Sequence, residues 1–179
     1  VPLNNSSKVD FSEKFKISQA EKAIFVSESD EYNYSYIGNE CQHSFYSYLK
    51  SKQTPGLVLF TSGTSGVPKA AVHEFSKLLE KFKTPRGALK TVNFLMFDHW
   101  GGLNTLFHTL SNAGVVLTIK DRSPDAICAF IEKHKIELLP ASPTFFKLMI
   151  MSDAYLNYDL QSLKRITYGT EPMPETILK

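Results

Sequence analysis

Residues 56–72 read GLVLFTSGTSGVPKAAV, which is an apolar run, a loop rich in glycine and hydroxyl side chains, and a second apolar run. The first run, Leu57–Phe60, is short and continuous, as is typical of a buried strand, and Ala70–Val72 predicts a second strand. Glycine lets backbone N–H groups turn toward a ligand, and hydroxyl groups add donors. Lys69 brings a compact positive charge for phosphate oxygens. The pattern favours a phosphate-binding loop, although composition alone leaves a flexible surface turn as an alternative.

Two well-known loops do not fit this stretch. A Walker A loop needs a hydroxyl residue directly after its lysine, and Ala70 follows Lys69 here. A nucleophile elbow needs the spacing Gly-x-Ser-x-Gly, and residues 63–66 are one residue too short for it. A P-loop phosphotransferase is therefore disfavoured, and we assign no nucleophilic serine.

From Gly56 to the end, apolar runs alternate with stretches of helical periodicity. Beyond the first two strands, we expect strands at Val92–Phe97, Val115–Ile119, Ile136–Leu139 and Arg165–Tyr168. We expect helices at Ser76–Phe82 with Ser76 as its cap, at Leu103–Leu110, after Ser123-Pro124, after Ser142-Pro143, and after Pro174. Such alternation predicts an α/β fold with a mostly parallel sheet flanked by helices.

Residues 1–55 are harder to interpret, so we divide the chain into this N-terminal portion and an α/β core at 56–179. The pattern predicts a helix at Ser12–Glu21, a strand at Ala23–Val26, a loop at Glu28–Asn39 and one or two helical turns at His43–Lys50.

Polar clusters follow three of the expected strands. They come directly after Phe60, after Phe97 and after Tyr168. Open parallel sheets bind ligands outside the carboxyl ends of their strands. We therefore expect all three clusters to meet along one rim of the sheet.

Composition limits the classes of partner. The 179 residues carry 20 basic and 18 acidic side chains, a formal net charge of +2, which argues against a nucleic-acid partner. Hydrophobic residues make up 42% of the chain, as in ordinary globular proteins. No apolar run approaches the roughly 20 residues of a transmembrane helix. Cys41 and Cys128 are too few for a disulfide framework and lack metal-site spacing, so we assign no metal ligands.

The two ends of the sequence suggest an excised piece. The chain starts at Val1 without an initiator methionine and stops at Lys179 inside a helix-like stretch. No signal peptide is visible, so we expect a cytoplasmic protein.

The sequence FTSGTSGVPKA at residues 60–70 resembles the YTSGTTGxPKG signature of the adenylate-forming (AMP-binding) superfamily. Members include acyl- and aryl-CoA synthetases, adenylation domains of nonribosomal peptide synthetases, and luciferases. Ser65 replaces the second threonine, and Ala70 replaces the final glycine. The resemblance implies that the β- and γ-phosphates of ATP are held by Thr61, Ser62, Gly63, Thr64, Ser65, Gly66 and Lys69.

Three further segments resemble the same superfamily in the same order. FDHWGGLN at 97–104 resembles the aromatic/His motif of acyl-CoA synthetases, and Ser142-Pro143-Thr144 resembles the start of the "PPT" helix. RITYGTEPMP at 165–174 resembles the segment whose Gly-Gly-Glu-Pro-like turn lines the adenine pocket. The resemblance implies an acyl pocket formed by His99, Asp98, Trp100 and Gly102. It implies an adenine pocket formed by Gly169, Thr170, Glu171 and Pro172, with Thr170 in place of the second glycine.

Residues 168–171 also resemble a different motif, Tyr-Gly-x-Thr-Glu, whose glutamate helps to hold magnesium. One residue is missing here, and the superfamily places that motif further on. We therefore interpret Glu171 as part of the adenine wall.

The resemblance implies an enzyme that uses ATP and magnesium to convert a small carboxylic acid to an acyl-adenylate. The acyl group then passes to CoA or to the phosphopantetheine of an acyl carrier protein, in fatty acid metabolism or a related process. The superfamily's catalytic lysine belongs to a C-terminal domain absent from this sequence. We therefore assign no catalytic residue and expect a fragment of the large N-terminal lobe that is inactive alone.

Two alternatives remain open. In relatives that activate amino acids, an aspartate after phenylalanine in the aromatic motif pairs with the substrate's amino group, and Phe97-Asp98 mimics it. Gly101–Asn104 fits the acyl/aryl branch better, which we favour. The other alternative is a non-catalytic nucleotide-binding or carrier-interacting module.

Overall fold

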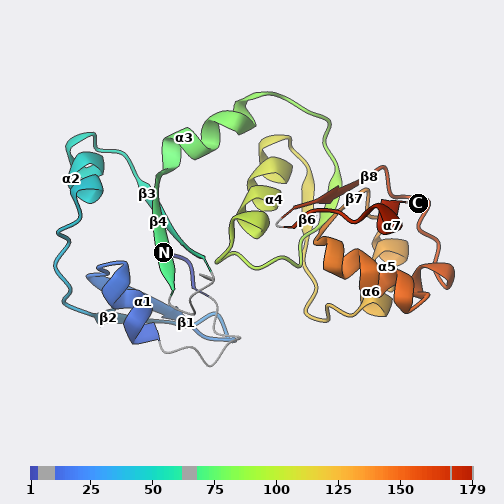
Figure 1. The fold of residues 1–179 in the computed structure, drawn as a ribbon, viewed down its shortest axis with the longest axis horizontal. Coiled ribbons are helices and arrows are strands. Elements are labelled where there is room, and N and C mark those ends of the chain that lie inside the picture. Colours follow the sequence, from blue (N-terminus) through green and yellow to red (C-terminus); the bar gives the residue numbers. More distant parts are fainter. Residues whose placement is uncertain (4–10, 62–67, 170, 179) are drawn as a thin grey trace. The chain divides into compact units, whose positions relative to one another are not determined.

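The structure is a computed structural model, and it describes residues 1–3, 11–61, 68–169 and 171–178. The chain forms two compact units, residues 1–80 and 81–179 (Figure 1). The division at 55/56 that we drew from the sequence pattern stays an interpretation.

The first unit holds two antiparallel hairpins and three helices among its described residues. Its elements are α1 (Phe11–Ile17), β1 (Lys22–Val26), β2 (Tyr32–Tyr36), α2 (Ser44–Ser51), β3 (Gly56–Thr61), β4 (Lys69–Glu74) and α3 (Phe75–Glu80). The loop expected at Glu28–Asn39 is wrong, because Tyr32–Tyr36 pairs with β1 as a strand. Ser76 is not a cap either: α3 begins at Phe75, and the Ser76 hydroxyl donates to the Glu74 carboxylate.

Strands β3 and β4 frame the phosphate-loop motif. They pair antiparallel from Gly56 opposite Glu74 to Thr61 opposite Lys69, so the loop joins two adjacent strands of a hairpin. The strands predicted at 57–60 and 70–72 are confirmed, but they form a pair of their own and do not join the parallel sheet.

The second unit is a parallel sheet with helices. Its elements are the single turn η1 (Lys81–Lys83), β5 (Lys90–Val92), α4 (Trp100–Ser111), β6 (Val115–Leu117), α5 (Pro124–His134), β7 (Leu138–Ala141), α6 (Pro143–Met151), the single turn η2 (Ala154–Leu156), β8 (Arg165–Tyr168) and α7 (Glu175–Leu178). Among the described residues the sheet has four strands in the order β6-β5-β7-β8, all parallel. The predicted fold class is confirmed.

Helix starts in this unit follow local sequence. Ser123 and Ser142 are N-caps whose hydroxyl groups accept from Ala126 N and Phe145 N, and a proline follows each cap. An N-cap hydroxyl satisfies a backbone donor that the first helical turn leaves free. Both predicted helix starts are therefore confirmed.

Three strands differ from their predicted bounds, and β6 ends at Leu117 instead of Ile119. Strand β5 ends at Val92 instead of Phe97, because the Asn93 side chain accepts a hydrogen bond from Leu95 N and turns the chain. Strand β7 starts at Leu138 instead of Ile136. Lys135 has a left-handed backbone with φ of 51°, and Ile136 N still bonds to Ile131 O of the preceding helix.

The apolar core of this unit lies between the sheet and helices α5 and α6. Its fully buried members include Val92, Ile127, Ile131 and Leu139. Burial raises the pKa of the Cys128 thiol to about 11, with a smaller contribution from Asp125. That thiol therefore stays protonated at neutral pH and acts as a small apolar side chain.

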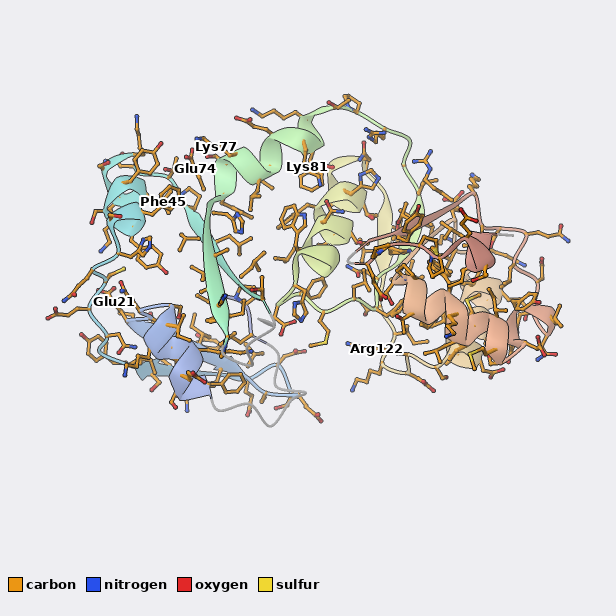
Figure 2. The ribbon with its side chains drawn as sticks, viewed as in Figure 1. Glu21, Phe45, Glu74, Lys77, Lys81 and Arg122 are labelled. Carbon is orange, nitrogen blue, oxygen red and sulfur yellow. The ribbon has the colours of Figure 1, made fainter. Side chains whose placement is uncertain are left out.

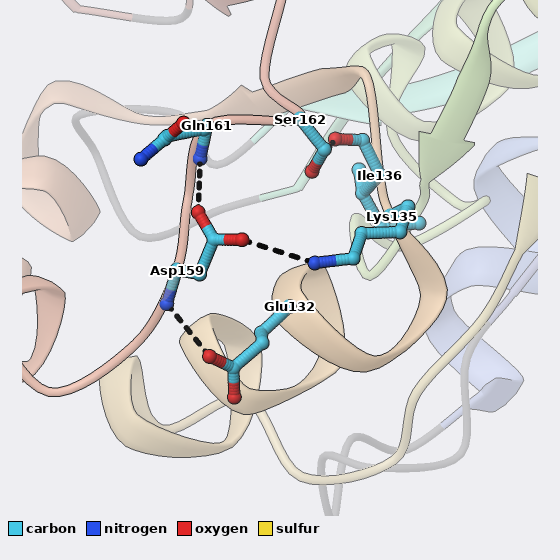
Figure 3. A network of polar contacts seen from close by, with 6 residues as sticks. All are labelled: Glu132, Lys135, Ile136, Asp159, Gln161 and Ser162. Carbon is cyan, nitrogen blue, oxygen red and sulfur yellow. Dashed lines mark hydrogen bonds and ion pairs between the residues drawn. The ribbon is translucent and has the colours of Figure 1, made fainter.

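A polar network joins the end of α5 to the segment before β8 (Figure 3). Lys135 Nζ lies 3.0 Å from an Asp159 carboxylate oxygen, and Asp159 N donates to Glu132. The Ser162 hydroxyl donates to Ile136 O at 2.7 Å. These bonds hold the segment leading into β8 beside the one leading into β7.

No helix among the described residues is long and apolar enough to cross a membrane.

Candidate functional site

The order of the strands creates one natural place for a ligand. From β5 the chain moves to β6 on one side and then returns to β7 on the other side of β5. Loops leaving β5 and β7 therefore part in opposite directions at the carboxyl edge. In open α/β sheets, ligands bind at such a switch point.

A cavity of about 540 Å³ lies at this edge. Its walls include Phe94–Met96 after β5, Ser142 after β7 and Thr167–Gly169 at the end of β8. Helix α4 contributes Gly102 and Asn104. Every strand of the parallel sheet except β6 thus supplies residues at or directly after its carboxyl end, and the connection after β6 supplies Arg122.

Asn93 fixes the wall between β5 and α4. Its side chain is almost fully buried, its amide donates to Gly102 O at 3.0 Å, and its amide oxygen accepts from Leu95 N at 3.3 Å. A buried amide bonded on both sides positions the segments that it joins. Our sequence reasoning missed this residue, although an amide inside the apolar run 92–97 was a usable signal.

Gly102 lies where α4 passes against the segment after β5. A Cβ atom at this position would come 2.3 Å from the carbonyl oxygen of Met96 and 2.7 Å from its carbon. Only glycine fits such an approach. The residue predicted for the acyl pocket therefore lines the cavity and also allows the cavity wall to close.

His99 and Asp98 differ in position. His99 lines the cavity at the start of α4, and 58% of its side chain is exposed. Asp98 is not among the cavity-lining residues. Only 11% of its side chain is exposed, and its buried Oδ1 lies 3.8 Å from His99 Nε2, without a hydrogen-bond partner among the described residues.

Trp100 also lies away from the cavity walls that the structure describes. Its ring packs near Phe82, with 6.5 Å between centroids, and Lys81 Nζ lies 5.3 Å from its centre. Lys81 also bonds to Asn104, and Figure 2 labels it where the helix-like turn η1 begins. Trp100, which we expected in the acyl pocket, is thus held by a cation–π contact with Lys81 and does not line the cavity.

The predicted adenine segment follows β8. Gly169 lines the cavity, and Glu171 accepts hydrogen bonds from the Thr144 hydroxyl at 2.9 Å to each carboxylate oxygen. Thr144 itself lines the cavity from the first turn of α6. Pro172 is exposed, and Thr170 lies outside the described residues.

The phosphate-loop residues belong to the first unit. Thr61 pairs with Lys69 at the end of the hairpin, where the Thr61 hydroxyl lies 3.4 Å from Lys69 O. Residues 62–66, which include the other five predicted contacts, lie outside the described part of the chain. Of the three polar clusters, those after β5 and β8 line one cavity; a shared rim with the loop stays a prediction.

Acidic, histidine and cysteine side chains do not gather in threes that would hold a metal ion anywhere in the described residues.

Burial, together with Arg86, Arg165 and Lys81, lowers the pKa of His108 on α4.

A cavity at the switch point of a parallel sheet is typical of α/β proteins that bind a small molecule at the carboxyl edge. The family model described as "AMP-binding enzyme" matches residues 6–179. The chain therefore belongs to the family of AMP-binding enzymes, which confirms the resemblance drawn from residues 60–70, 97–104 and 165–174.

Several relatives have names that describe ligases of carboxylic acids. Indoleacetate–CoA ligase from Aromatoleum aromaticum is 31% identical over 137 residues, which is 71% of this chain and 26% of that protein. 4-Chlorobenzoate–CoA ligase from a Pseudomonas species is 24% identical over 69% of this chain and 25% of that protein. The chain thus spans about a quarter of the length of these relatives.

Solved structures share the fold. The amide bond synthetase McbA from Marinactinospora thermotolerans is 26% identical with a TM-score of 0.58, over 68% of this chain and 25% of that one. The N-terminal domain of FACL13 from Mycobacterium tuberculosis is 19% identical with a TM-score of 0.59, over 67% of this chain and 32% of that one.

Proposed function

We propose that this chain supplies the nucleotide- and acid-binding part of an enzyme that activates a carboxylic acid with ATP. One observation carries the proposal: segments from two separate motifs, one containing Gly102 and one containing Gly169, line a single cavity at the switch point. The family match over residues 6–179 supports the same activity. The product would be an acyl-adenylate, with CoA or a carrier-protein thiol as the acceptor.

The two ends of the cavity take different parts of this reaction. Gly169, Thr170, Glu171 and Pro172 would form the adenine wall beside β8. His99 and Gly102 would border the acid, with His99 as a wall or gate. Asp98 and Trp100 would act from outside the cavity, by supporting His99 and the start of α4.

The chemical step is attack by a carboxylate oxygen on the α-phosphorus of ATP. A new P–O bond forms to the acid, and the bond from the α-phosphorus to the bridging oxygen breaks, so pyrophosphate leaves with the electron pair. Donors from Thr61 to Gly66 and the Lys69 ammonium would stabilise the charge that builds on pyrophosphate. Magnesium, when bound, would neutralise phosphate charge, and we assign it no ligand among the residues that the structure describes.

An acyl or aryl acid is favoured over an amino acid. Recognition of an amino group by Asp98 would require that carboxylate to face the cavity, and Asp98 does not line it. The names of the indoleacetate and 4-chlorobenzoate ligases support the aryl branch. A role in fatty acid metabolism and a cytoplasmic location remain proposals.

The test is carboxylate-dependent exchange between ATP and pyrophosphate, with aryl, fatty and amino acids in parallel. It is carried out on the full polypeptide that the gene encodes and on residues 1–179. We expect exchange with aryl or fatty acids in the full polypeptide and none in residues 1–179. ATP binding without exchange for any acid in the full polypeptide would favour a non-catalytic nucleotide-binding module.

A further inference from the structure

Arg122 lines the cavity, and the proposed reaction gives it no role. Among the described residues that line the cavity, it is the only one with a permanent charge. The other walls are mainly apolar, hydroxyl or backbone groups, apart from the His99 imidazole and the Asn104 amide. Within the described part of the chain, the Arg122 guanidinium forms neither a hydrogen bond nor an ion pair. Figure 2 labels it in the connection between β6 and α5.

The neighbours of Arg122 fix its backbone without neutralising its charge. The Asp121 carboxylate accepts from Ser123 N at 2.8 Å, and the Ser123 hydroxyl accepts from Ala126 N at 3.3 Å. The hydrogen bond from Ser123 N lowers the pKa of Asp121. The Asp121 carboxylate is thus engaged at the start of α5, and Arg122 remains available to a ligand.

Arg122 lies at the opposite end of the cavity from the adenine segment. It follows β6 at one edge of the sheet, whereas Gly169 and Glu171 follow β8 at the other edge. Three strand spacings of about 4.8 Å separate these edges, or roughly 14 Å. An acid whose reacting carboxylate meets ATP near β8 would extend its other end toward Arg122.

We infer that Arg122 is a specificity-determining residue that binds a second anionic group at the far end of the acid substrate. The inference rests on the proposed function and names the substrate class: dicarboxylic acids with an apolar spacer. A guanidinium holds a carboxylate through two parallel hydrogen bonds, a geometry that lysine does not reproduce. The apolar middle of the cavity, with Phe94, Leu95 and Phe145, fits the spacer.

The test compares matched acids in the exchange reaction of the full polypeptide, without any thiol. The pairs are benzoate with terephthalate and octanoate with octanedioate. We expect the wild type to prefer the diacid of at least one pair, and Arg122→Ala to lose about tenfold or more in kcat/KM for that diacid only. Arg122→Lys should fall between them. Arg122→Glu should instead favour 4-(aminomethyl)benzoate, because the charge at the far end is reversed.

Lys120→Ala is the matched control. It removes an exposed positive charge two residues away that does not line the cavity, so the diacid preference should persist. Calorimetric titration of each variant with the preferred diacid, without ATP, measures binding independently of turnover. A thermal melt checks that each variant is folded.

Other outcomes separate the two proposals. If monoacids are activated and Arg122→Ala leaves the ratio of diacid to monoacid unchanged, the inference is wrong while the proposed function stands. A rise in KM for ATP that is equal for both acids would assign Arg122 to the nucleotide and overturn the inference. If none of the acids supports exchange, the proposed function itself is overturned.

Discussion

The Thr144 hydroxyl lies 2.9 Å from both carboxylate oxygens of Glu171, which joins the first turn of α6 to the segment after β8. Thr144 also lines the cavity, so the contact connects the cavity wall to the proposed adenine segment. The two residues are 27 positions apart in the chain, so the sequence around either residue does not predict their contact.

Thr144→Val should therefore loosen the adenine segment while it keeps the shape of the side chain. We expect KM for ATP to rise about threefold to tenfold in the exchange reaction, with kcat less affected, because one hydrogen bond to a charged group is lost. Thr144→Ser restores the hydroxyl and should recover most of the affinity. An unchanged KM for ATP in Thr144→Val would remove the positioning role.

Two adjacent glycines on α4 should respond in opposite ways to alanine. Gly102→Ala places a Cβ atom 2.3 Å from Met96 O, so we expect the free energy of unfolding to fall by about 1–3 kcal/mol. At Gly101 the nearest atom would be Leu95 Cδ1 at 3.6 Å, an ordinary contact. Gly101→Ala should therefore be neutral or stabilising by up to about 1 kcal/mol, because alanine favours helix.

Urea unfolding followed by circular dichroism measures both variants under the same conditions. Equal midpoints for the two variants would contradict the close approach of α4 to the segment after β5. The comparison is internal, because both substitutions add the same methyl group to neighbouring positions of one helix.

Thr64→Ala tests the phosphate loop, whose role rests on the motif in residues 61–69. Loss of one donor to the departing pyrophosphate should raise the adenylation barrier by about 2–4 kcal/mol, by analogy with an oxyanion donor. The readout is the exchange rate at saturating acid and ATP. Ser51→Ala, which removes an exposed hydroxyl from α2 in the same unit, should leave the rate unchanged. A normal rate in Thr64→Ala would remove that residue from the site.

The pH dependence of stability should depend partly on His108. Burial and the nearby Arg86, Arg165 and Lys81 hold its pKa below the ordinary value of 6.5. Above that value His108 is neutral in both the folded and unfolded states, so it costs no stability. As pH falls below about 6.5, the unfolded state takes up a proton first, and stability falls until the folded-state pKa is passed.

His108→Gln should therefore reduce the loss of thermal stability on acidification. Melting curves from pH 8 to pH 5 measure it, and the difference at pH 8 gives the packing effect of the substitution alone. A loss as steep as that of the wild type would show that His108 does not contribute.

The structural elements that the sequence predicts well are those determined by residues close to them in the sequence. The caps at Ser123 and Ser142 act within three positions, so the two helices begin where the sequence indicates. Strand β2 was missed because Tyr32–Tyr36 is ordered by pairing with β1, and nothing within the tyrosine-rich segment specifies that partner.

The candidate site divides in the same way. His99, Gly102 and Gly169 could be proposed because their segments match motifs. Asn93 left a weaker signal, an amide inside the apolar run 92–97, which only its bond to Gly102 explains. Arg122 could not be proposed, because its role arises from the strand order β6-β5-β7-β8. A residue that acts across a sheet carries no mark of that role in its own neighbourhood.

Trp100 is the only tryptophan of the chain, and it lies two positions before Gly102 with Lys81 against its ring. An indole beside a fixed ammonium has an emission spectrum that depends on that contact. The chain thus carries its own fluorophore at the start of α4. Movement of this helix when a ligand enters the cavity would change the emission of Trp100. Occupancy of the cavity can therefore be followed by intrinsic tryptophan fluorescence, without an attached label.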